Sequence, residues 1–130
     1  MNKFLLLFLM PVLVWLQNAD AKADCNSLNS LSSAQIKTLL SNKNKNEIGS
    51  IFFALGDCET SNAMPVLISY LEDKRITHEL RFKGMSYRYM ASVALGKISR
   101  HKILVQENAS DAEYAKAIAE WKKHLAKPIE

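Results

Sequence analysis

The sequence predicts an all-α domain of about five helices that follows an N-terminal signal peptide. Three observations lead to this fold class. Apolar residues recur at helical spacing in several segments, and helix-capping patterns precede two of these segments. In addition, Ala54-Leu55-Gly56 returns forty residues later as Ala94-Leu95-Gly96. A helix end that recurs at this period indicates a helical repeat.

Residues 1–23 are expected to be a signal peptide. Lys3 gives the positive start, residues 4–16 form the apolar run, and small-residue patterns place cleavage after Ala21 or Ala23. The run is shorter than the roughly 20 residues that span a bilayer, although an uncleaved anchor is the alternative. The mature chain, residues 24–130, is expected to be one domain, periplasmic or secreted, without stable membrane insertion.

Cys25 and Cys58 are the only cysteines, and both lie in the mature chain. An even number of cysteines in an exported protein favours a disulfide. Cys25 precedes the first predicted helix and Cys58 ends the second, and these two ends are neighbours in an antiparallel helix pair. The sequence therefore predicts a Cys25–Cys58 disulfide, with two unpaired thiols as the alternative. No nearby histidine or cysteine completes a metal ligand set.

The first two helices are predicted over residues 32–40 and 46–56. Ser32 and Gln35 form a capping box for the first, and Asn46 is a plausible cap for the second. The apolar faces follow the i, i+3, i+4, i+7 spacing, with Ile36, Leu39 and Leu40 in the first helix and Ile48, Ile51, Phe52 and Leu55 in the second.

The remaining three helices are predicted over residues 61–73, 86–98 and 110–127. Pro65 fits the first turn of the third helix, where its missing N–H costs little, and Pro128 ends the fifth. Ser110 and Glu113 form a second capping box. The predicted inner faces are Met64, Leu67, Ile68 and Leu71; Tyr87, Met90, Ala91, Ala94, Leu95 and Ile98; and Tyr114, Ile118, Trp121 and Leu125. Residues 103–105 are expected to cover the edge of the core.

The third and fourth predicted helices carry a characteristic set of residues: Pro65, Leu67, Leu71 and Asp73, then Arg88, Ala91 and the ending Ala94-Leu95-Gly96-x-Ile98. This set resembles a HEAT repeat, as in bacterial HEAT-repeat domain proteins. Residues 48–56 look like the second helix of a preceding repeat. The resemblance implies a HEAT-like α–α superhelix, with Asp73 and Arg88 in the polar ladder of the repeat turn. That turn is usually short in the family, whereas fourteen residues intervene here, residues 74–87. We call this segment the inserted loop.

No residue pattern predicts catalysis, a cofactor or a metal. His78, His101 and His124 lie on separate loops or helix ends and are expected at the surface. The acidic pairs fall at helix ends, and the four glycines form no phosphate-binding loop. We therefore expect a protein that is not an enzyme, although a hydrolase with an unrecognised site is an alternative.

The inserted loop is the predicted interaction site. It is basic and carries aromatic residues, and Arg and Tyr are residue types that anchor interfaces. The expected contacts to a partner are Arg75, His78, Arg81, Lys83 and Tyr87. Ile76, Leu80, Phe82 and Met85 are expected to hold the loop against the core, and simple core cover is the alternative role of the whole segment.

The expected partner is another protein with an acidic cleft, and export argues against nucleic acid. The formal charge of +4 is compatible with such a partner. By analogy of size, compartment and fold, we expect an inhibitor or immunity protein against a secreted cell-wall-degrading effector. An envelope assembly or enzyme accessory factor is the alternative.

Overall fold

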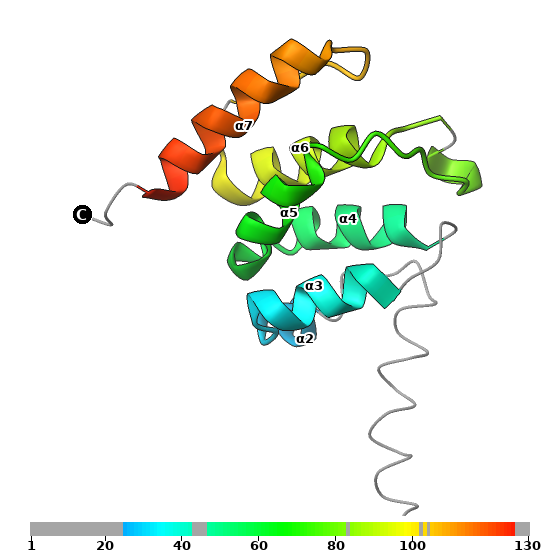
Figure 1. Ribbon diagram of the computed structural model, residues 1–130. Coiled ribbons are helices and arrows are strands. Elements are labelled where there is room, and N and C mark those ends of the chain that lie inside the picture. Colours follow the sequence, from blue (N-terminus) through cyan, green and yellow to red (C-terminus); the bar gives the residue numbers. More distant parts are fainter. Residues whose placement is uncertain (1–24, 43–46, 83, 102, 104, 127–130) are drawn as a thin grey trace, which may run out of the picture.

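The computed structural model describes residues 25–42, 47–82, 84–101, 103 and 105–126, which fold into helices joined by connecting segments (Figure 1). The helices are α2 (Cys25–Asn29), α3 (Ser33–Asn42), α4 (Ile48–Asp57), α5 (Met64–Tyr70), α6 (Tyr87–Ser99) and α7 (Asp111–Ala126), with short 3₁₀ turns η2 (Ser61–Ala63) and η3 (Leu80–Phe82). The predicted all-α class is confirmed. Within these ranges, no helix has the length and apolar character needed to cross a membrane.

Capping side chains start three of the helices. In α3 the predicted capping box is confirmed, because Ser32 accepts a hydrogen bond from the Gln35 N–H at 3.2 Å and Gln35 accepts one from the Ser32 N–H at 2.8 Å. A serine hydroxyl also caps the start of α6 and of α7. Ser86 accepts a hydrogen bond from the Tyr89 N–H, and Ser110 accepts one from the Glu113 N–H. Pro65 lies in the first turn of α5, as predicted. Asn46 lies outside the described residues.

The short helix α2 was not predicted. It begins at Cys25, which is bonded to Cys58 across 33 residues, so the predicted disulfide is confirmed. Leu28 of α2 is buried in the core. Asn29 donates to the Cys58 carbonyl at 3.2 Å and accepts from the Thr60 hydroxyl at 2.6 Å. These contacts hold a five-residue helix that is too short to be stable alone.

Helix α5 lies at the centre of the fold. It contacts α3, α6 and α7, while α4 packs along α6. Figure 1 shows the resulting stack, with α7 above α6, α4 below it and α3 below α4. Each of the helices α3 to α7 therefore packs on at least one other helix.

The two Ala-Leu-Gly segments pack against each other. A side chain on Gly56 would lie 3.0 Å from the Cα of Ala94, so the missing side chain allows α4 and α6 to approach closely. Near the other end of α4, the corresponding position on Gly49 faces the sulfur of Met90. Residue numbers rise together along both helices, which therefore run parallel. The repeated sequence thus marks two helices that pack side by side.

The core follows the predicted faces except at one position. Leu67, Leu71, Leu95 and Trp121 are fully buried, and Ala94 is 2% exposed, as predicted. Leu125, predicted on the inner face of α7, is instead 41% exposed. It lies in the last turn described for α7, one turn beyond the buried Trp121. Ile103 covers the core as expected, Val105 packs against it, and Leu104 lies outside the described residues.

Candidate functional site

The inserted loop leaves and rejoins the helices through a stem of backbone hydrogen bonds. A single antiparallel bridge joins Ile76 and Ser86. The bonds run from the Arg88 N–H to the Asp73 carbonyl (3.0 Å), from Tyr87 to Arg75 (2.7 Å) and from Thr77 to Met85 (2.9 Å). The loop therefore has its own local structure, which a simple turn between α5 and α6 does not require.

Two contacts fix the far part of the loop on α4. The Glu79 carboxylate accepts hydrogen bonds from the Ser50 N–H at 3.1 Å and from the Ser50 hydroxyl at 2.5 Å. The Phe82 ring stacks on Phe53, with ring centroids 4.6 Å apart and planes 11° from parallel. The carboxylate of Glu79 is thus turned toward α4, and Phe82 holds the loop down as predicted.

Two apolar residues of the inserted loop are exposed to solvent. Leu80 is 92% exposed and Ile76 is 50% exposed, so the prediction that both pack against the core is wrong. Leu80 lies between Glu79 and Phe82 in the sequence, and the side chains of those two residues take the contacts with α4. Among the described residues, Ile76, Leu80 and Leu125 are the large apolar side chains exposed to solvent, and two of these three belong to the inserted loop.

Tyr87 is a core residue and cannot be a partner contact in this structure. It is only 1% exposed, and its ring centroid lies 6.0 Å from that of Phe52. The Arg75 guanidinium lies over the Tyr87 ring at 4.9 Å and is itself 61% exposed. Burial raises the pKa of the Tyr87 hydroxyl, although the charge of Arg75 opposes that shift.

Arg75 is bound within its own loop by Asp73. The Arg75 Nε and Nη2 atoms reach the Asp73 carboxylate at 2.9 and 2.5 Å, and the Arg75 N–H also donates to it at 3.1 Å. These hydrogen bonds hold the pKa of Asp73 below its usual range, against the effect of partial burial. The charge of Arg75 is therefore largely committed to Asp73.

Protonation of Asp73 in acid should weaken its hydrogen bonds to Arg75 and lower the stability of the protein. A carboxyl group whose pKa falls on folding stabilises the protein above its unfolded pKa of about 4, and that contribution is lost as pH falls through the folded value. Asp73→Asn should therefore lower the free energy of unfolding at pH 7 by about 0.5–1 kcal/mol and lose less stability than the wild type below pH 4. Urea unfolding across pH 2–7 measures both effects, and parallel curves for the two proteins would contradict the assignment.

Arg81 and His78 complete the exposed polar part of the loop. Arg81 donates to the Ser50 hydroxyl at 2.9 Å, and its guanidinium lies 5.1 Å from the centre of the Phe82 ring. Within the described residues, no carboxylate lies at ion-pair distance from Arg81. His78 is exposed, and Lys83 lies outside the described residues. The guanidinium of Arg81, next to Leu80 in the sequence, therefore has polar and aromatic contacts but no ion-pair partner among the described residues.

Asp73 and Arg88 are neighbours through the backbone, but their side chains have other partners. The Asp73 carboxylate binds Arg75, as described, whereas Arg88 Nη1 binds Asp111 at 2.8 Å. The Arg88 guanidinium also lies over the Tyr114 ring at 4.1 Å. The side-chain ladder implied by the HEAT resemblance is therefore replaced by a tie between α6 and the start of α7.

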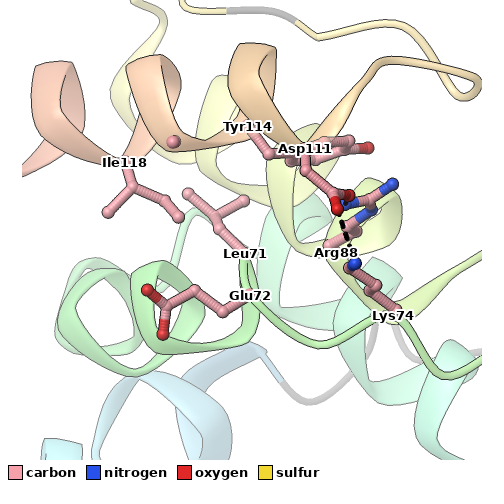
Figure 2. A pocket seen from close by; sticks show the side chains of 8 residues that line it. Leu71, Glu72, Lys74, Arg88, Asp111, Tyr114 and Ile118 are labelled. Carbon is pink, nitrogen blue, oxygen red and sulfur yellow. Dashed lines mark hydrogen bonds and ion pairs between the residues drawn. The ribbon is translucent and has the colours of Figure 1, made fainter.

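A cavity of about 290 Å³ adjoins this tie. It is lined by Leu71, Glu72, Lys74, Arg88, Asp111, Tyr114, Ala115 and Ile118 (Figure 2). Asp111 sits between two cations, 2.6 Å from Lys74 Nζ and 2.8 Å from Arg88 Nη1, and they hold its pKa below its usual range. Because these charges already satisfy each other, we interpret the cluster as a tie between α6, α7 and the inserted loop.

Two of the three histidines come together at the other end of α7. His101 and His124 stack with ring centroids 4.6 Å apart, and both contact the buried Trp121 edge-on. From the sequence, these residues were expected at separate places on the surface, because no local pattern links a residue after α6 to one near the end of α7. Within the described ranges, no three His, Cys, Asp or Glu residues are grouped so as to hold a metal ion.

Comparison with protein-family models, curated proteins and solved structures found no match to this chain. The class of protein therefore rests on the features described above: an all-α domain with a disulfide and an ordered, apolar-tipped loop. Leu80, Ser50 and Glu79 are the site residues that the sequence analysis did not single out for binding. The sequence signals that pointed to this region were the length of the inserted loop and its basic and aromatic residues.

Proposed function

We propose that this chain is an exported, non-enzymatic protein-binding module, and that the inserted loop is its binding surface. The observation that carries the proposal is the 92% exposure of Leu80 on a loop fixed by Glu79 and Phe82. Exposed apolar side chains in a rigid setting favour binding, because little conformational entropy is lost on association. Arg81, the next residue after Leu80, is of a type that is enriched among the residues that dominate interface energies.

The packing supports a HEAT-like helical repeat as the scaffold. Helix α5 contacts both α3 and α7, two helices before and after it in the chain, and α4 contacts α6. Packing of each helix on the second next helix is the arrangement of stacked helical repeats. The close approach of Gly56 to Ala94 gives the repeated Ala-Leu-Gly segment a packing role.

The disulfide supports export, because disulfides persist in oxidising compartments. We propose that residues 1–23, which lie outside the described residues, direct the chain to the periplasm or the exterior. Within that compartment, we favour an inhibitor or immunity protein against a secreted cell-wall-degrading effector. A projecting loop on a stable helical domain suits the obstruction of another protein's cleft. An envelope assembly factor would use the same surface, and a neighbouring toxin gene would favour the inhibitor.

Leu80→Asp should abolish most partner binding without unfolding the protein. A charge at the tip cannot enter an apolar site, so the affinity should fall by about a hundredfold, or about 2.7 kcal/mol. The thermal midpoint should hardly change, because Leu80 has few contacts in the free protein. The protein is purified from the host envelope, its partner is captured and identified, and the dissociation constant is measured for both proteins.

Leu125→Asp is the matched control, because Leu125 is the exposed large apolar residue at the far end of α7. It should bind the partner as the wild type does. Equal binding by the Leu80 and Leu125 variants would place the interface elsewhere and leave the loop as cover for the core.

A second variant tests the charges of the loop. Changing Arg75, Arg81 and Lys83 together to Ala should weaken binding of the partner by more than about tenfold.

A further inference from the structure

A cationic and aromatic strip continues from Leu80 along α4. The Arg81 guanidinium lies 5.1 Å from the Phe82 ring, Phe82 stacks on Phe53 at 4.6 Å, and Lys97 of α6 lies 5.3 Å from the Phe53 ring. Both rings are half-buried, so their outer edges reach the surface. The strip thus consists of two apolar rings with a cation at each end, and Leu80 stands beside one of those cations.

The strip exposes more positive than negative charge. Glu79, the carboxylate nearest Leu80 in the sequence, is turned inward onto Ser50 and is satisfied there. Lys97 has Asp57 as a partner at 2.7 Å, but both side chains are about half exposed and such a pair is weak. Arg81 contacts the Ser50 hydroxyl and the Phe82 ring, and among the described residues no carboxylate lies at ion-pair distance from it. A bound surface that removed water from this strip would have to supply carboxylates.

The position of Leu80 restricts the shape of that surface. The inserted loop extends past the start of α4 and α6, at one end of the helix stack (Figure 1). A side chain that is 92% exposed at such a tip gains apolar contact only by entering a recess in its partner. A flat surface would touch one side of it, and a short peptide offers no recess.

We propose that the partner is a folded protein with an apolar pocket rimmed by carboxylates, in which Leu80 enters the pocket and Arg81 and Lys97 meet the rim. This inference rests on the proposed protein-binding function and specifies its partner chemistry. It predicts association that weakens with added salt, because the rim contacts are partly exposed charge pairs. It also distinguishes the apolar tip, which sets the dissociation rate, from the cations, which steer association.

Site-specific photo-crosslinking tests the proposal in the producing cell. Leu80 in the full-length chain is replaced with p-benzoylphenylalanine, and Lys116, an exposed residue of α7, is replaced in the same way as a control. Irradiation should give an adduct from position 80 and none from position 116. Peptide mapping should place the attachment on apolar residues of a folded partner, with Asp or Glu beside them.

Charge reversal tests the rim with the captured partner. Arg81→Glu should weaken binding by more than about tenfold and should reduce the dependence of affinity on salt. Lys116→Glu changes the net charge equally and should leave affinity within about twofold. Equal effects of the two variants would overturn the specific role of Arg81.

The outcomes separate this inference from the proposed function. Adducts from position 116 alone, or attachment of position 80 to a basic or flat polar surface, would contradict the proposed apolar pocket. Either result would still be compatible with the proposed protein-binding function. Attachment to a second copy of this chain or to lipid would also overturn the pocket. If neither position gives an adduct and envelope extracts yield no partner, both the inference and the proposed function fail.

Discussion

Leu95→Ala should lower the free energy of unfolding by about 2–5 kcal/mol. Leu95 is fully buried in α6, the helix that packs against both α4 and α5. Removal of its side chain loses apolar burial and leaves a cavity that close-packed neighbours can only partly fill. Denaturant unfolding followed by circular dichroism measures the change, which should appear in the midpoint with the slope unaltered.

Leu125→Ala supplies the comparison, because it removes the same atoms from a side chain that is 41% exposed. Its cost should be well below that of Leu95→Ala. Similar costs would mean that the two helix faces are wrongly assigned.

Reduction of the Cys25–Cys58 disulfide should destabilise the protein by about 3–4 kcal/mol. The bond closes a segment of 33 residues, and in the chain-entropy model such a constraint raises the free energy of the unfolded state by this amount. Helix α2 should unfold first, since it depends on the disulfide, on Leu28 and on the contacts of Asn29. Thermal unfolding with and without reductant measures the total effect.

The double variant Cys25→Ser, Cys58→Ser should already have the lower stability and should not respond to reductant. Labelling of both thiols in the oxidised, folded protein, without denaturant, would contradict the disulfide.

Features set by local sequence were predictable. The capping box of Ser32 and Gln35 needs only residues three apart, and the buried faces of α5 and α6 follow directly from helical spacing. The disulfide was also predictable, because two cysteines leave one pairing within the chain. Helix α2 was not, since its stability comes from contacts with residues 58 and 60 rather than from its own sequence.

The structure of the inserted loop was predictable only in part. Phe82 packs on α4 as expected. Tyr87, which was expected both on the inner face of its helix and as a partner contact, is buried, and Leu80, which was expected against the core, is exposed. Tyr87 is the first residue of α6 and therefore lies on its buried face, beside Phe52. Leu80 is exposed because Glu79 and Phe82 find partners on α4, some thirty residues earlier in the chain. Pairings over that distance leave no periodic signal in the sequence.

The stem of the inserted loop has a consequence for how this surface can change. Because the Arg88 N–H donates to the Asp73 carbonyl at 3.0 Å, the loop begins and ends at almost one point on the helical domain. Segments inserted between such adjacent points can vary in length at small entropic cost, since closure entropy grows only with the logarithm of length. Changes in the length of the inserted loop are therefore expected to cost the helical domain little, provided that the contacts of Glu79 and Phe82 on α4 are kept.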